Sequence, residues 1–141
     1  MSPFYRNTAL LLVPLVLFLT TFDLVAGATS FSGIHVQMFN NLSSGSDLTV
    51  HCKSRDDDLG VHLVRFSKGF YEFEFSVNIW KTTLFFCSFQ WPNAFHWFDI
   101  YSFHRDADLC TNCIWKVNET GPCLLDLHNS KKYDICYEWS K

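Results

Sequence analysis

The sequence predicts an all-β fold, an antiparallel β-sandwich held by disulfide bonds. Short runs of alternating apolar and polar residues recur at roughly ten-residue intervals, with turn-forming residues between them. No run shows a 3.6-residue apolar repeat over the length of a helix. The chain of 141 residues also contains 15 Phe, 5 Tyr, 5 Trp and 6 Cys. This composition suits one domain with an aromatic core and covalent cross-links.

The first residues have the pattern of a secretory signal peptide. Arg6 provides a basic start, residues 8–22 are apolar, and residues 26–28 are the small residues that signal peptidase requires. The apolar run is shorter than the roughly 20 residues that a membrane-spanning helix needs. We therefore expect a signal peptide at 1–28 and a secreted, extracellular domain at 29–141.

The sequence of the first half of this domain predicts four successive strands. In three of the runs, apolar residues occupy every second position, so that one face of the strand packs on a core and the other meets water. In the run 61–66, Val61 and Leu63 share one face, and His62, Val64 and Phe66 share the other. The clearest run alternates aromatic residues with Glu72 and Glu74. The expected strands cover residues 34–38, 48–52, 61–66 and 71–77.

Residues 82–91 differ because they are apolar on both faces. One face carries Leu84 and Phe86, and the other carries Phe85, Cys87, Phe89 and Trp91. Such a strand is expected at the centre of a sheet, covered on both sides. Turn signals at Pro92-Asn93 and Gly121-Pro122 separate the later runs. These later strands are expected at 95–103, 114–117, 124–127 and 133–139.

The cysteines indicate a disulfide framework, because an even number in a small secreted chain is typical of one. They are Cys52, Cys87, Cys110, Cys113, Cys123 and Cys136. The sequence alone leaves their pairing open. The CxxC spacing at 110–113 also occurs in zinc and redox sites. However, no second matched pair accompanies it, and residues 114–117 after it are strand-like rather than helical. Structural disulfides are therefore favoured.

Two N-glycosylation sequons are present, at Asn41-Leu-Ser43 and Asn118-Glu-Thr120. The expected secretion of the chain makes them credible sites. If they carry glycans, both asparagines must face solvent. They would then mark surfaces that do not bury against a partner.

The segment His51-Cys-Lys-Ser-Arg-Asp-Asp-Asp-Leu-Gly60 contains three adjacent carboxylates beside a cysteine. Because adjacent carboxylates repel one another, we expect them in solvent, on a loop anchored by Cys52. Calcium is one possible ligand of an acidic loop. Calcium-binding EF-hand loops alternate their acids and place glycine at position six, whereas this segment does neither. We therefore expect no metal site and no other cofactor.

Candidate catalytic groups are few. They are Asp56, Asp57 and Asp58 with His51 or His62, and His96 with Asp99 and His104. Contiguous, uniformly hydrated carboxylates do not provide the two different environments that acid–base catalysis requires. Neither a G-x-S-x-G nor an H-E-x-x-H motif occurs, and oxidised cysteines are not nucleophiles. The sequence predicts a protein that is not an enzyme.

The charge balance limits the possible partners. The formal net charge is −3, and the basic residues are scattered apart from Lys131-Lys132. Nucleic acids and anionic membranes both attract basic surfaces. We therefore expect no nucleic-acid binding and no membrane insertion of the mature chain, while its oligomeric state stays open.

Several sequence blocks, in their order and spacing, resemble the plant self-incompatibility protein S1 family. They are Val36-Gln-Met-Phe-Asn-Asn-Leu42, Leu48-Thr-Val-His-Cys-Lys-Ser-Arg-Asp-Asp-Asp-Leu-Gly60, Phe73-Glu-Phe75, Thr82-Thr-Leu-Phe-Phe-Cys87, Phe98-Asp-Ile-Tyr101, Cys110-Thr-Asn-Cys-Ile-Trp115, Gly121-Pro-Cys123 and Tyr133-Asp-Ile-Cys-Tyr-Glu-Trp139. The resemblance implies a small secreted β-sandwich without enzymatic activity. The best-understood member of that family is a stigma determinant that triggers calcium signalling in pollen and rejection of self-pollen. Some relatives have fewer cysteines, which allows Cys123 and Cys136 to be an added pair.

The resemblance and the expected loops together give the functional hypothesis, an extracellular signalling ligand for a cell-surface receptor. Recognition residues commonly lie on loops that a rigid sandwich positions. The candidate contact residues are Arg55, Asp56, Asp57, Asp58, Lys68, Asn93, His96, Arg105 and Asp106. The alternative is a secreted carbohydrate- or cell-wall-binding module, which would need an exposed Trp91, Trp97 or Trp139 as a stacking platform.

Overall fold

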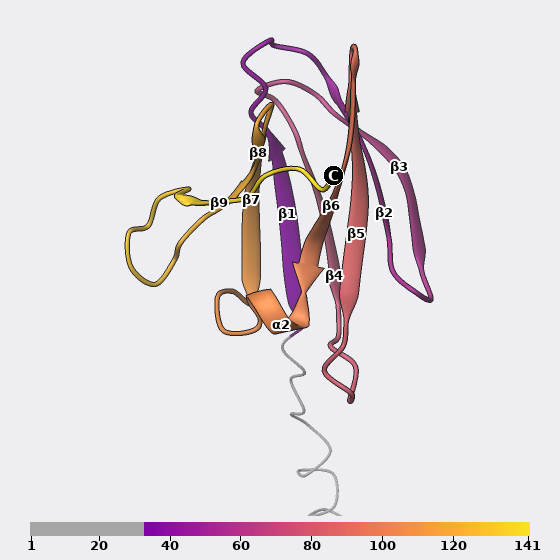
Figure 1. Ribbon diagram of the computed structural model, residues 1–141, viewed down its shortest axis with the longest axis vertical. Coiled ribbons are helices and arrows are strands. Elements are labelled where there is room, and N and C mark those ends of the chain that lie inside the picture. Colours follow the sequence, from indigo (N-terminus) through magenta and orange to yellow (C-terminus); the bar gives the residue numbers. More distant parts are fainter. Residues whose placement is uncertain (1–32) are drawn as a thin grey trace, which may run out of the picture. The chain divides into compact units, whose positions relative to one another are not determined.

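Two β-sheets face each other across residues 33–141, the part of the chain that the computed structural model describes (Figure 1). The expected signal peptide, residues 1–28, lies outside the described residues. The strands are β1 (Ile34–Asn40), β2 (Leu48–Lys53), β3 (Asp58–Val64), β4 (Phe70–Phe75), β5 (Leu84–Trp91), β6 (Ala94–Ser102), β7 (Asn112–Asn118), β8 (Gly121–Leu124) and β9 (Ile135–Cys136), and a short helix, α2 (Phe103–Asp106), follows β6. The first sheet has the order β4-β1-β7-β8-β9 and the second has the order β3-β2-β5-β6.

The predicted all-β sandwich is confirmed, with one departure from antiparallel pairing. β1 pairs with β7 in parallel, with His35 opposite Asn112. The other strand pairs of the two sheets are antiparallel. A parallel pair needs a long connection, and here that connection passes through the whole second sheet.

The later elements differ from the prediction in their bounds. β8 begins at Gly121, three residues before the expected strand, and β9 covers two residues instead of seven. Gly121 has φ +143°, and a Cβ atom there would overlap the carbonyl oxygen of Tyr137. The expected turn at this glycine is therefore the start of a strand that the C-terminal segment approaches closely. At the end of β6, Phe103 starts a helical turn rather than extending the strand.

The core lies between the sheets and follows the predicted alternation in β1, β2 and β4. In β3 the prediction fails, because Val61 and Leu63 are exposed and Val64 is the buried residue. Val36 and Met38 from β1 face Val50 and Cys52 from β2 within one buried cluster. The other buried apolar residues are Leu42, Leu48, Val64, Phe85, Cys87, Phe89, Phe98, Ile100, Tyr101, Cys110, Cys113, Trp115, Val117 and Leu124. Burial of these aromatic and aliphatic side chains stabilises the domain by about 25 cal/mol per Å² of apolar surface.

β5 is central, as expected, but the prediction that both of its faces are covered is wrong. It lies between β2 and β6 and buries Phe85 and Phe89 in the core. Its other face carries Leu84, which is 40% exposed, and Phe86, whose ring centroid lies 6.1 Å from that of the exposed Trp97 on β6. The second apolar face of the run is therefore a surface, and a sequence pattern cannot distinguish a covered face from an exposed apolar one.

All six cysteines are paired, which confirms the predicted disulfide framework. The bonds are Cys52–Cys87, Cys110–Cys113 and Cys123–Cys136. The first joins the neighbouring strands β2 and β5, and the third joins β8 and β9. The second closes the turn before β7. Each bond acts within one sheet or turn, so the two sheets adhere through apolar packing rather than through a disulfide.

Candidate functional site

The acidic run forms the end of the β2–β3 hairpin. Ser54 N donates to the carbonyl of Asp57 at 2.8 Å, and Ser54 Oγ accepts from Asp57 N at 3.1 Å. Cys52 fixes the preceding strand through its disulfide to β5. The backbone of the hairpin end is therefore held, while the side chains of Arg55, Asp56 and Asp57 are exposed.

Asp58 differs from its two neighbours because its own hairpin binds it. His51 Nε2 lies 2.6 Å from Asp58 Oδ1, and Gly60 N donates to the same oxygen at 3.0 Å. Lys53 Nζ lies 3.4 Å from the other carboxylate oxygen. The hydrogen bond with His51, followed by that from Gly60, lowers the pKa of Asp58 to about 2. This carboxylate secures β2 to β3 and leaves Asp56 and Asp57 as the free acids.

The β5–β6 hairpin carries two more candidate contact residues, of which one is exposed and the other is packed against aromatic rings. Asn93 is exposed at the turn and has φ +65°, a left-handed conformation that asparagine tolerates. His96 is half-buried and stacks on Trp139, with ring centroids 4.8 Å apart. Trp91 packs against the same tryptophan. Asn93 is therefore available to a partner, whereas the His96 ring belongs to an aromatic cluster.

The expectation that Asp106 contacts a receptor is wrong, because its side chain is fully buried. It accepts hydrogen bonds from Ser102 N at 2.9 Å and from Arg105 Nε at 2.7 Å. The Arg105 guanidinium also lies over the rings of Phe98, Trp115 and Tyr137, at 4.9, 5.5 and 4.8 Å from their centroids. A buried carboxylate requires such a partner. Both charges therefore fix α2 against the core, and the Arg105 charge is already neutralised.

The second group of candidate catalytic residues is not gathered into a site. His96 lies at the start of β6 and His104 lies in α2, beyond its end. The strand between them spans about 20 Å at the usual rise per residue. Over residues 33–141, no three His, Cys, Asp or Glu side chains are placed to hold a metal ion. In the same range, no helix has the length and apolarity to cross a membrane.

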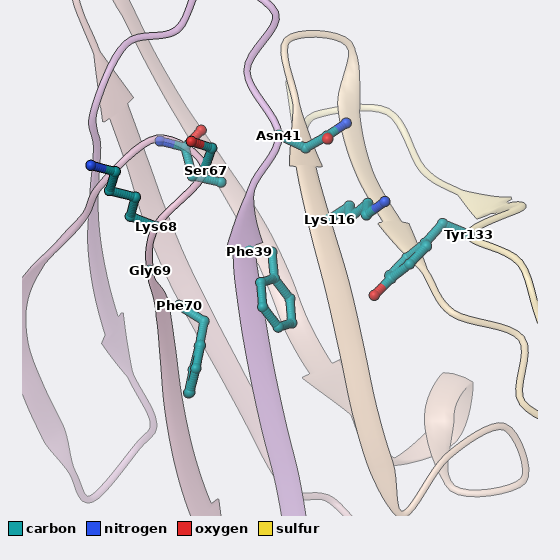
Figure 2. A pocket seen from close by; sticks show the side chains of 9 residues that line it. Phe39, Asn41, Ser67, Lys68, Gly69, Phe70, Lys116 and Tyr133 are labelled. Atoms are coloured by element: carbon teal, nitrogen blue, oxygen red, sulfur yellow. The ribbon is translucent and has the colours of Figure 1, made fainter.

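A pocket of about 420 Å³ lies against the outer face of the first sheet (Figure 2). Figure 2 shows Phe39 and Phe70 side by side on neighbouring strands, with Lys116 and Tyr133 across from them and Lys68 at the rim. Lys116 Nζ lies 4.4 Å from the centre of the Tyr133 ring. The exposed Lys68 is the candidate contact residue here. The rings of Phe39 and Phe70 could hold a small planar group, and the ammonium groups of Lys68 and Lys116 could hold an anionic one.

The two sequon asparagines meet beside this pocket. Asn41, which lines the pocket, is exposed, and its Nδ2 donates to Asn118 Oδ1. The Nδ2 of Asn118 is directed at the carbonyls of Lys116 and Gly121, at 3.4 and 3.3 Å. A glycan on Asn41 would therefore project over the pocket mouth. One on Asn118 would displace contacts within the β7–β8 turn.

Sequence reasoning missed the β4–β5 turn. Ile79 and Trp80 there are 84% and 77% exposed, more than any other large apolar residue in the described chain. One feature of the sequence could have indicated this turn. Ile79 and Trp80 lie between the polar residues Asn78 and Thr82, outside any alternating run. The turn borders a groove of about 860 Å³, whose other wall is the acidic hairpin end at 54–57.

Comparisons with known proteins agree with the fold and with the sequence blocks. The family model described as plant self-incompatibility protein S1 matches residues 35–139. S-protein homolog 5 of Arabidopsis thaliana is 45% identical over 113 residues, which cover 80% of this chain and 84% of that protein. S-protein homolog 2 of the same plant is 40% identical, with 75% and 68% covered. One solved structure aligns with a TM-score of 0.56 at 18% identity. It is described as a self-incompatibility protein homologue, from a widespread family of small, highly stable, secreted proteins from plants. That alignment covers 81% of this chain and all of the other.

Proposed function

Because this chain belongs to the plant self-incompatibility protein S1 family, we propose that it is a secreted extracellular ligand recognised by a cell-surface receptor protein. Its role would be cell–cell communication, of the self-incompatibility or the developmental kind, without enzymatic activity. The description of the structurally similar plant proteins as secreted supports the extracellular location. The expected signal peptide at 1–28 supports it as well.

The observation that carries this proposal is the β2–β3 hairpin end. Its backbone is fixed by Ser54 and by the Cys52–Cys87 disulfide, while Arg55, Asp56 and Asp57 remain exposed. A fixed loop loses little conformational entropy when it binds, and its charges steer a complementary partner. These are properties of a surface that is recognised, rather than of a site that performs chemistry.

The test is a cell-surface binding assay with the fluorescently labelled mature protein on plant protoplasts. We expect saturable binding that protease treatment of the protoplasts removes. The charge-reversed variant Asp56→Lys/Asp57→Lys should bind at least tenfold more weakly, with an unchanged circular dichroism spectrum. The matched control Lys131→Glu/Lys132→Glu changes the same number of charges in the β8–β9 connection and should bind normally.

Two outcomes would contradict the proposal. The first is that the unaltered protein shows no protease-sensitive binding on any protoplast type. The second is binding that survives charge reversal of every exposed loop. Retention of the protein on insoluble wall polysaccharide, with binding lost in Trp97→Ala, would instead support a wall-binding module.

A further inference from the structure

The β4–β5 turn exposes two large apolar side chains at one end of the sandwich. It projects beyond the ends of the strands, near α2 in Figure 1. Ile79 is 84% exposed and Trp80 is 77% exposed. Leaving such side chains in water forfeits the favourable transfer free energy that their burial would provide. Clustered apolar exposure of this kind marks interaction sites on soluble proteins.

Hydrogen bonds hold this turn in one conformation. Asn78 N donates to Thr83 Oγ1 at 2.8 Å, and Asn78 Oδ1 accepts from Thr82 N at 3.0 Å. Asn78 Nδ2 donates to Thr82 Oγ1 at 3.1 Å, and Lys81 N donates to the carbonyl of Asn78 at 3.1 Å. The turn therefore presents its apolar pair on a preformed support. A preformed support lowers the entropic cost of binding.

The groove beside the turn gives the surface its charge. Its lining contains the carboxylates of Asp56, Asp57 and Glu74, against the guanidinium of Arg55. The rest of the lining combines small polar residues, such as Ser76 and Thr83, with apolar ones, among them Leu84 and Phe86. The surface therefore combines an apolar anchor with a net negative rim, an arrangement typical of protein–protein interfaces in which a buried aromatic residue is surrounded by charges.

We propose that the β4–β5 turn and the adjoining groove form the docking surface for the receptor, and that the receptor presents an apolar pocket rimmed by Lys or Arg side chains. This inference rests on the proposed function and specifies its contact surface. Trp80 enters the pocket as the anchor. Asp56, Asp57 and Glu74 pair with the basic rim.

Charge distinguishes a basic receptor surface from the two other partners that an exposed tryptophan could contact, a membrane and a second copy of the chain. A tryptophan at a membrane interface would bring the three carboxylates against an anionic lipid surface, which repels them. A second copy of the chain would place the same carboxylates opposite one another, which is also unfavourable. A basic protein surface is the occupant that complements both parts of the groove.

The experiment uses the mature protein and the protoplast binding assay, with phosphatidylcholine–phosphatidylserine vesicles as a second probe. Ile79→Ser and Trp80→Ser are the test variants, and both sites are exposed, so the fold should persist. Phe95→Ser is the matched control, because Phe95 is an exposed aromatic residue. It lies by the β5–β6 turn, at the opposite end of β5 from the β4–β5 turn. We expect Trp80→Ser to weaken protease-sensitive binding about 30-fold or more. Phe95→Ser should change it less than threefold.

Salt provides an independent readout. Raising the ionic strength should slow association of the unaltered protein, because screening weakens attraction between the carboxylates and the basic rim. The variant Asp56→Asn/Asp57→Asn should lose most of this salt dependence while keeping the Trp80 contribution.

Each remaining outcome overturns the inference in a recognisable way. If the turn variants bind protoplasts as tightly as the unaltered protein, the docking surface lies elsewhere and the proposed function survives. Trp80-dependent binding to lipid vesicles would identify a membrane contact instead. A dimer in analytical ultracentrifugation that Trp80→Ser abolishes would identify self-association. If the unaltered protein shows no protease-sensitive binding, the proposed function fails along with its surface.

Discussion

At the scale of single residues, Asn40 shows how a polar side chain can fix a loop from inside the core. Its Nδ2 donates to the carbonyls of Ser46 and Val64 at 2.8 and 3.0 Å, and its Oδ1 accepts from Leu42 N at 3.1 Å. Both protons of the buried amide are donated and its oxygen accepts one bond, so the β1–β2 connection is tied to the end of β3.

Asn40→Asp should therefore destabilise the fold strongly. A carboxylate cannot donate to the two carbonyls and would repel both of them, so we expect a loss of about 2–3 kcal/mol in urea unfolding at pH 7. The loss should diminish near pH 4, where the acid begins to protonate. The control Asn41→Asp changes the adjacent exposed asparagine, loses one surface hydrogen bond to Asn118 and should cost at most about 1 kcal/mol. Equal effects of the two variants would contradict the role given to Asn40.

Asp58 should titrate far below an ordinary aspartate. Since its pKa in the fold is about 2 and its usual value is 3.8, the hydrogen-bonded Asp58 carboxylate stabilises the fold above about pH 4. This contribution is lost as the pH falls through about 2. Carboxyl NMR titration should give a midpoint near 2 for Asp58 and a midpoint closer to 3.8 in His51→Ala. A midpoint near 3.8 in the unaltered protein would refute the pairing.

The two sequons should differ in occupancy. Asn41 is exposed and donates one hydrogen bond from an amide with two protons, so a glycan can replace the other proton. The amide of Asn118 is directed into the β7–β8 turn. Peptide mass spectrometry of the plant-expressed protein should find a glycan at Asn41 and little at Asn118. Preferential occupancy of Asn118 would contradict this.

At the scale of elements, the disulfides stabilise unequal lengths of chain. Cys52 and Cys87 are separated by 35 positions, whereas Cys110 and Cys113 are separated by 3. Loop-closure entropy therefore assigns about 4 kcal/mol to the first bond and about 2 kcal/mol to the second. Cys52→Ala/Cys87→Ala should lower the midpoint of guanidinium unfolding more than Cys110→Ala/Cys113→Ala does. The opposite order would show that the short bond acts by another route.

The elements that could be predicted from the sequence are those with one wet face. β1, β2 and β4 alternate clearly, because each exposes every second side chain. α2 could not be predicted, since its four residues are held by Asp106 and by Arg105 over three rings from other elements. The same contacts engage Arg105 and Asp106, which the sequence alone presents as charges on an exposed loop.

The candidate site was predictable in part, for the same physical reason. Three adjacent carboxylates must lie in solvent, which placed the β2–β3 hairpin end correctly. Ile79 and Trp80 carry no such constraint, because apolar residues between strands are usually buried. Their exposed fractions in the fold show that the pair is displayed, and the hydrogen bonds of Asn78 to Thr82 and Thr83 hold the turn that displays it.

At the scale of the whole domain, the two ends of the sandwich carry different features. The sequon asparagine Asn41 follows the last residue of β1, whereas Ile34 at its start pairs with Phe75, just before the β4–β5 turn. The seven residues of β1 span about 20 Å. A glycan on Asn41 and a receptor on the turn can therefore occupy the molecule together, and removal of the natural glycan should leave receptor binding unchanged.

A glycan moved to the turn should have the opposite effect. Lys81→Asn creates an Asn-Thr-Thr sequon with Thr82 and Thr83, and Lys81 has φ +57°, which asparagine tolerates. The variant retains Ile79 and Trp80 but covers them with sugar, so protoplast binding should be lost in the glycosylated form. Enzymatic deglycosylation should restore it. The control Lys81→Asp makes no sequon and should bind at least tenfold better than the glycosylated variant, because a bulky glycan blocks the approach that one changed charge only weakens. Undiminished binding of the glycosylated variant would mean that the receptor approaches a different part of the domain.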